Sequence, residues 1–114
     1  MKIEEKIQNH LAILKIDGNI MGGPETDELH EKIRKLIEDG IKQVVLNLQD
    51  VKWMNSAGLG ALIACLASLK NANGILKLAK VTRKIESLLV ITQLNKIFET
   101  YENVEKAVAS MTEE

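Results

Sequence analysis

The sequence is short of the residues that build disulfide frameworks, metal sites and aromatic binding platforms. Its 114 residues include one cysteine, one tryptophan, one tyrosine, one phenylalanine and two histidines. A single cysteine excludes an internal disulfide and is typical of a reducing cytoplasm. His10 and His30 have no partner at ligand spacing, so we expect no metal, and no other cofactor is indicated. So few aromatic residues provide no stacking platform for a single nucleic-acid strand.

An excess of one charge and a long apolar run are also lacking. The formal net charge is -1, from 15 basic and 16 acidic residues that are interleaved along the chain rather than gathered in blocks. Proteins that bind nucleic acid through its phosphates carry a strong positive excess, so we expect no nucleic-acid partner. The longest apolar run falls well short of the roughly 20 residues of a membrane helix. Residues 1–5 contain no apolar signal-peptide core, so a cytoplasmic protein without membrane insertion is predicted.

The apolar content is sufficient for one hydrophobic core. Apolar residues make up 46% and charged residues 27% of the chain, which is the balance of a globular protein. A chain of this length forms a core without disulfides or metals. Since no repeat or linker interrupts it, we predict a single domain over residues 1–114.

Hydrophobic periodicity predicts alternating strands and helices. An antiparallel hairpin is predicted over residues 2–16, with its turn at Asn9-His10. A helix is predicted to start near Pro24 and to stop at Gly40. The remaining expected elements are strands at 43–48, 75–79 and 95–100, and helices at 59–69, 82–91 and 102–111. A helical crossover between successive strands favours parallel pairing, so the pattern predicts a small α/β domain.

One stretch, Trp53–Gly60, connects the strand at 43–48 to the following helix. Asn55 and Ser56 are both good N-cap residues. Gly58 and Gly60 allow another backbone to approach closely. The stretch therefore presents a serine hydroxyl at a helix N-terminus, where amides and the helix dipole favour an added negative charge.

The helix that follows lacks charge on both sides. Its predicted core stripe is Leu59, Leu62, Ile63, Leu66 and Leu69. The other side holds small residues, namely Ala57, Gly58, Ala61, Ala64, Cys65 and Ser68. A surface helix normally presents Lys and Glu to water. A smooth face beside the serine therefore predicts that another molecule docks there.

The segment Val51-Lys52-Trp53-Met54-Asn55-Ser56-Ala57-Gly58-Leu59-Gly60 resembles the signature of STAS domains, in particular the small bacterial anti-sigma-factor antagonists. In that family an apolar pair precedes Asp-Ser, a small residue and Gly-Leu. The serine accepts phosphate from a partner that is both an anti-sigma factor and a serine kinase. The resemblance covers nearly the whole chain, and it implies the STAS fold, a mixed sheet of four or five strands with about four helices.

The resemblance implies a regulator of sigma-factor-dependent transcription that is not an enzyme. Ser56 would be the phosphate acceptor. The dephosphorylated protein would bind an anti-sigma factor with a histidine-kinase-like ATP-binding fold, and a phosphatase would reset the cycle. We expect the isolated domain to be a monomer. The expected docking surface comprises Ile20, Met21, Gly22, Gly23, Asn55, Ala57, Gly58, Leu59, Ala61, Ala64 and Cys65.

Two positions depart from the family pattern. Asn55 occupies a position where Asp is commonest, and Met21 occupies the Asp position of a Gly-x-Leu-Asp pattern after the hairpin. Either the kinase is adapted to a neutral site, or Ser56 is only a helix cap. In the second case the chain would be a constitutive interaction subunit, such as the soluble STAS subunit of a phospholipid transport complex.

Several residues also have a purely structural interpretation. The apolar residues of the 20–23 loop are either partner contacts or a hydrophobic staple to the first helix. Trp53 is predicted to pack in the core or at a strand end. Cys65 is also interpreted as an inert apolar filler. No nucleophile–base–orienter set surrounds Ser56 in the sequence, which argues against catalysis.

Overall fold

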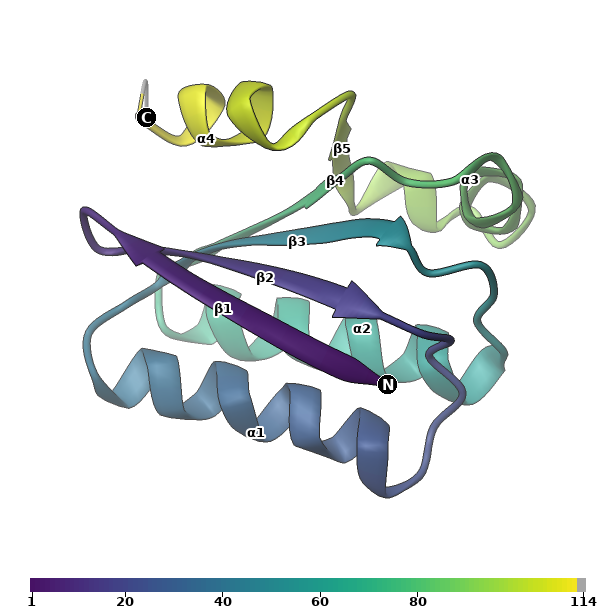
Figure 1. The fold of residues 1–114 in the computed structure, drawn as a ribbon, viewed down its shortest axis with the longest axis horizontal. Helices are drawn as coiled ribbons and strands as arrows, with labels where there is room; N and C mark the ends of the chain where they lie inside the picture. The colour runs from purple at the N-terminus through teal and green to yellow at the C-terminus, as the bar shows by residue number, and fades with distance from the viewer. Residues whose placement is uncertain (113–114) are drawn as a thin grey trace.

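A five-stranded mixed sheet forms the centre of the computed structural model, which describes residues 1–112 (Figure 1). The strands lie in sequence order: β1 (Lys2–Gln8), β2 (Leu11–Asp17), β3 (Gln43–Asp50), β4 (Ile75–Ala79) and β5 (Glu99–Tyr101). The first pair is antiparallel and the other three pairs are parallel. The helices are α1 (Pro24–Glu38), α2 (Ser56–Asn71), α3 (Arg83–Ile91), the short 3-10 helix η1 (Leu94–Lys96) and α4 (Val104–Thr112). Within residues 1–112 this confirms the implied mixed sheet of four or five strands with about four helices.

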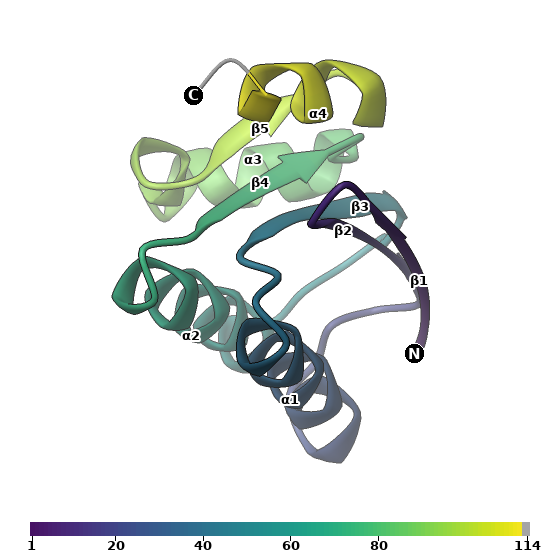
Figure 2. The same cartoon turned by 90° about the vertical axis from the view of Figure 1, so that its left-hand side faces the viewer.

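The helices form layers on both faces of the sheet. Figure 2 shows α1 and α2 on one face and α4 on the other. α3 lies near the C-terminal ends of β2 and β3 (Figure 1). Side-chain alternation along β3 separates two cores, because Val44, Leu46 and Leu48 belong to the larger core and Val45 belongs to the smaller one. The larger core packs against α1 and α2, and the smaller core packs against α4.

The turns explain why the predicted boundaries of the first elements are correct. Asn9 and His10 both have positive φ, 49° and 65°, as a two-residue hairpin turn requires. Gly40 has φ 83° and ends α1 with a pair of backbone hydrogen bonds. Its amide donates to the Ile37 carbonyl at 3.0 Å, and the Ile41 amide donates to the Leu36 carbonyl at 2.8 Å. This pattern confirms the stop predicted at Gly40.

The segment predicted as a last strand at 95–100 divides into three parts. Gln93, at φ 63°, separates α3 from η1, and the Phe98 amide then donates to the Leu94 carbonyl at 3.0 Å. Phe98 is buried in the larger core. Burial of this ring holds the chain in a helical turn, so the strand begins only at Glu99.

Lys77 lies buried in the centre of β4, facing α4, and the sequence did not predict this. Its Nζ donates to Ser110 Oγ at 2.8 Å and to Tyr101 OH at 3.2 Å, and it pairs with Glu99 at 3.1 Å. These partners compensate for the burial of the charge. Lys77 is exposed by only 1%, so α4 covers a polar cluster as well as an apolar one.

Candidate functional site

Ser56 is the first residue of α2, and Asn55 fixes the geometry of that helix start. Asn55 is the N-cap residue, with φ -95° and ψ -177°, and its Oδ1 accepts from the Gly58 amide at 2.8 Å. Its Nδ2 donates to the carbonyl oxygen of Met21 at 2.9 Å. One side chain therefore caps the helix and fastens the 18–23 loop to it.

The 18–23 loop lies against the 51–55 loop and extends the pairing of β2 with β3. The Ile20 amide donates to the Trp53 carbonyl at 3.1 Å, and the Trp53 amide donates to Asn19 Oδ1 at 3.1 Å. Ile20 and Met54 also form an isolated parallel bridge, and both side chains are fully buried. The two loops thus form one rigid unit that positions Ser56.

Two glycines allow this close approach. A Cβ on Gly58 would overlap the carbonyl oxygen of Ile20. A Cβ on Gly22 would lie 2.7 Å from the Cβ of Ala57, and Gly22 also has φ +87°. By contrast, a Cβ on Gly60 would meet open space. Gly22 and Gly58 therefore shape the site from inside.

The expected docking residues do not all reach the surface. Ser56, Ala57, Gly23 and Met21 are exposed, and Gly22, Asn55, Ala61 and Ala64 are half-buried. Ile20, Gly58, Leu59 and Cys65 are buried, so the prediction that they contact a partner is wrong. Ile20 is buried because its backbone pairs with the 51–55 loop and its side chain points into the larger core. Of the two interpretations for this residue, the structure supports internal packing.

The small-residue face of α2 points towards α1 rather than towards solvent. Ala61, Ala64, Cys65 and Ser68 share one side of the helix. A hydrogen bond of 2.8 Å joins Ser68 Oγ on this side to His30 Nε2 of α1. Cys65 is fully buried, and burial raises the pKa of its thiol from 9.0 to about 12. The small side chains therefore permit close packing of the two helices, and Cys65 is the inert filler of the alternative interpretation.

The outward side of α2 is a different stripe. It consists of the exposed residues Ser56, Gly60, Ile63 and Ala67. Ile63 was expected in the core, but 39% of it is exposed. The other four residues of the predicted core stripe are buried, so the stripe is confirmed except at Ile63: Leu59, Leu62, Leu66 and Leu69. No charge before Lys70 marks the outward side of the helix in the sequence.

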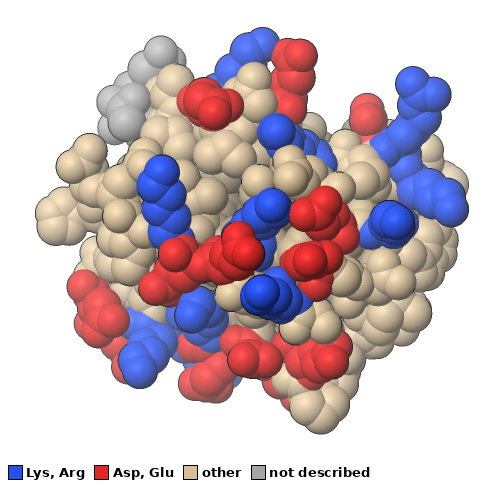
Figure 3. Space-filling view, viewed as in Figure 1, with Lys and Arg blue, Asp and Glu red and all other residues tan. Residues whose placement is uncertain are grey.

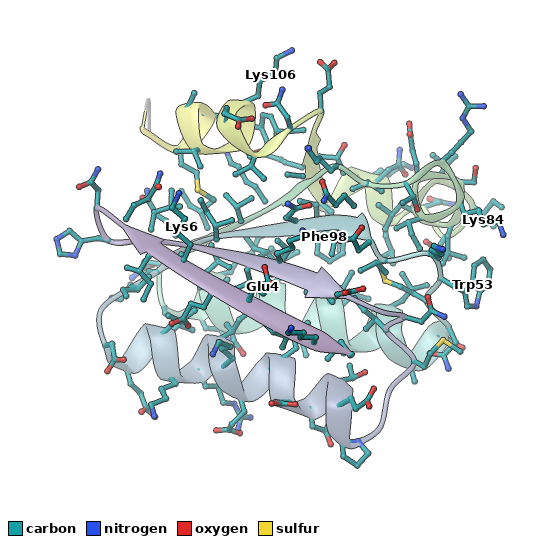
Figure 4. All side chains as sticks on the ribbon, in the orientation of Figure 1. Glu4, Lys6, Trp53, Lys84, Phe98 and Lys106 are labelled. Carbon is teal, nitrogen blue, oxygen red and sulfur yellow. The ribbon has the colours of Figure 1, made fainter. Side chains whose placement is uncertain are left out.

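An uncharged surface surrounds the serine. Trp53 was predicted to be packed, but it is 43% exposed, and Met21 is 46% exposed. We define the Ser56 surface as Met21, Trp53, Ser56, Ala57, Gly60 and Ile63. Figure 4 shows Trp53 projecting from the edge of the molecule, and Figure 3 shows a broad uncharged area at the same edge. A surface of this kind can exclude water against a protein partner.

The described residues show no sign of a metal centre or of a membrane span. No group of three or more His, Cys, Asp or Glu side chains in residues 1–112 is placed to hold a metal ion. Within the same range, no helix has the length and apolar character needed to cross a membrane. The chemistry available at the site is that of an exposed hydroxyl on an apolar surface.

Comparisons with known proteins agree with this geometry. The chain is 28% identical over 105 residues to the anti-sigma-B factor antagonist of Staphylococcus aureus, covering 92% of this chain and 96% of that protein. A protein from Thermotoga maritima superposes with a TM-score of 0.86 at 22% identity, covering 95% of this chain and 92% of that one. SpoIIAA in its phosphorylated form, from Bacillus, superposes with a TM-score of 0.74 at 14% identity, covering 96% and 99%. A family model described as "STAS domain" matches residues 2–107. The predicted resemblance is thereby confirmed, and the protein belongs to the STAS domain family.

Proposed function

We propose that this protein is an anti-sigma-factor antagonist whose binding to an anti-sigma factor is switched off by phosphorylation of Ser56. The observation that carries the proposal is the exposure of Ser56 at the start of a capped helix, on a surface without charge. The similarity to the Staphylococcus aureus anti-sigma-B factor antagonist supports the class of partner. The anti-sigma factor would also be the serine kinase, and a phosphatase would restore the free serine.

The proposed switch is electrostatic. The Ser56 hydroxyl oxygen attacks the γ-phosphorus of ATP held by the kinase with its magnesium ion, the kinase takes the proton, and ADP leaves. The product carries about -1.5 to -2 charges at neutral pH. The N-terminus of α2 tolerates this charge because of its dipole, whereas an apolar partner surface would have to desolvate it. The phosphorylated protein is therefore released.

The neutral residues beside Ser56 are compatible with this switch. Asn55 donates to the Met21 carbonyl through its amide nitrogen, which an ionised Asp cannot do. Its role in this chain is therefore to hold the loop. A phosphoacceptor needs only the exposed hydroxyl, and the kinase provides the other groups.

A constitutive interaction subunit is the alternative. The same two neutral positions, Asn55 and Met21, favour it, since it needs no kinase. Such a subunit would use the Ser56 surface without a covalent change.

Two substitutions of Ser56 separate these functions. Binding to the purified anti-sigma factor of the host, without ATP, is measured for Ser56→Ala and Ser56→Asp. The proposal predicts that the alanine variant binds and the aspartate variant does not. Asn9→Asp is the control, because it adds the same charge at the hairpin turn, at the opposite end of the sheet (Figure 1). Equal binding of both Ser56 variants would favour the constitutive subunit.

A further inference from the structure

The charges are not evenly distributed along the chain, contrary to the expectation of interleaving. Residues 1–50 carry seven basic and ten acidic side chains. Residues 51–98 carry seven basic side chains and one acidic side chain, Glu86. The basic residues of this segment are Lys52, Lys70, Lys77, Lys80, Arg83, Lys84 and Lys96. All except Lys77 are exposed, so the part of the surface built by residues 51–98 is positive.

The outer face of α3 adds an apolar component to this positive region. Ile85 and Leu89 anchor the helix in the larger core. The opposite side forms a shallow groove lined by Arg83, Glu86, Ser87, Val90 and Ile91. Val90 is 55% exposed and Ile91 is 79% exposed. We define the α3 surface as Arg83, Lys84, Ser87, Val90 and Ile91.

This surface is continuous with the loop that presents Ser56. Thr82 Oγ1, at the N-terminus of α3, donates to the Val51 carbonyl at 3.3 Å. Figure 4 shows Lys84 and Trp53 at the same edge of the molecule, and Figure 3 shows basic side chains above the uncharged area there. A partner seated on the Ser56 surface therefore extends over α3 if its own surface fits.

We propose that the α3 surface is a second docking surface for the same anti-sigma factor, and that it binds a segment with apolar side chains flanked by Asp and Glu. Two observations select this chemistry: the excess of exposed basic residues in 51–98, and the exposed Val90 and Ile91 in the same groove as Arg83. An anionic membrane is the less suitable occupant, because Glu86 lies in the groove and would be repelled by it. A protein segment with one basic residue opposite Glu86 satisfies every charge. This inference rests on the proposed function, since both surfaces bind the same partner.

The first test reverses charge at two positions. Binding of the host's purified anti-sigma factor, without ATP, is measured for the double variant Arg83→Glu/Lys84→Glu. The matched control is Arg34→Glu/Lys35→Glu, an exposed Arg-Lys pair on α1. We expect on the order of tenfold weaker binding for the α3 variant, with a slower association rate and a weaker salt dependence. Binding of the α1 control is expected to equal that of the wild type.

The second test removes one apolar contact. Ile91→Ser is compared with Ile7→Ser, since Ile7 is also exposed, by 48%, but lies on β1. Neither side chain belongs to a core, since Ile91 is 79% and Ile7 is 48% exposed, so we expect both variants to fold. We expect on the order of tenfold weaker binding for the Ile91 variant alone.

The outcomes separate the two proposals. If the wild type binds and the α3 variants bind equally well, the second docking surface is refuted while the proposed function stands. If the wild type does not bind the anti-sigma factor, the proposed function itself fails. Flotation of the wild type with phosphatidylglycerol vesicles that is lost in Ile91→Ser would assign this face to a membrane, and it would overturn the inference.

Discussion

Asn55 provides a quantitative test of the site, because one side chain makes two separate interactions. Asn55→Ala removes both, and Asn55→Asp removes only the donor to Met21. Loss of an N-cap costs about 1 kcal/mol, and loss of a hydrogen bond costs about 0.5–1.5 kcal/mol. The alanine variant should therefore lose about 1.5–2.5 kcal/mol of unfolding free energy.

The aspartate variant should lose much less. Its carboxylate still accepts from the Gly58 amide, and a negative charge at a helix N-terminus contributes about 0.3–1 kcal/mol. This contribution offsets part of the free energy that is lost with the hydrogen bond to Met21 and through the repulsion between the carboxylate and the Met21 carbonyl. We expect a net loss of about 0–1 kcal/mol.

Urea and thermal unfolding of the two variants test this order. For a domain of this size, 1 kcal/mol corresponds to about 4 °C in Tm. We therefore expect Tm to fall by about 6–10 °C for Asn55→Ala and by less than about 4 °C for Asn55→Asp. Asn71→Ala, at the exposed C-terminal end of α2, serves as the control and should change little. If the alanine and aspartate variants are equally destabilised, or if neither is, Asn55 does not have the two roles that its hydrogen bonds indicate.

Further predictions concern the interior. Gly58→Ala forces a Cβ against the Ile20 carbonyl, so it should lower the unfolding free energy by at least about 2 kcal/mol. Gly60→Ala meets open space and should raise the unfolding free energy by about 1 kcal/mol. Urea unfolding in which both variants change the unfolding free energy in the same direction would contradict the close approach at Gly58. The Cys65 thiol should not react with a thiol reagent in the native protein at pH 8. A rapid reaction of the native protein at pH 8 would refute the burial of this thiol. Folding raises the pKa of the thiol from 9.0 to about 12, so only the thiol of the unfolded chain ionises as the pH rises through 9. The unfolding free energy should therefore fall between pH 9 and 12. Lys77→Met should either increase the unfolding free energy or lower it by less than about 1 kcal/mol. Lys77→Ala should lower it by about 2–5 kcal/mol, because it leaves a cavity. Equal effects of the two variants would show that the volume of this side chain is unimportant.

Most of the element boundaries were predictable because local signals agree with the fold, whereas the topology of the sheet was implied by the resemblance to STAS domains. The hairpin turn at Asn9-His10, the stop at Gly40 and the strand at 43–48 all combine a hydrophobic pattern with matching turn residues. The helical crossover then fixed the parallel pairing of β3 with β4. These signals act over a few residues and need no tertiary contact to be interpreted.

What covers the small-residue side of α2 was not predictable, because the information lies in another helix. Small residues on one side are equally compatible with an external partner and with α1, and the bond between Ser68 and His30 exists only in the folded chain. The exposure of Trp53 has a similar origin, since the pairing of the 18–23 and 51–55 loops turns this side chain outwards. The site motif itself was visible, but its surroundings depend on the tertiary structure.

The buried Lys77 was missed for a related reason. A lysine between two leucines in a strand indicates one solvent-exposed face. In this chain α4 covers that face and provides Ser110, and β5 provides Tyr101 and Glu99. None of these partners is near Lys77 in the sequence.

The central claim is that Ser56 is a phosphate acceptor, and the most direct measurement is intact mass spectrometry of the protein isolated from its own host, with mapping of the modified residue. The account predicts a species heavier by one phosphate, with the phosphate on Ser56, and the loss of that species after treatment with a phosphatase. Phosphate mapped only to another serine, or no phosphorylated species under any growth condition, would contradict it. Ser56 would then be a helix-terminal residue of a constitutive docking subunit.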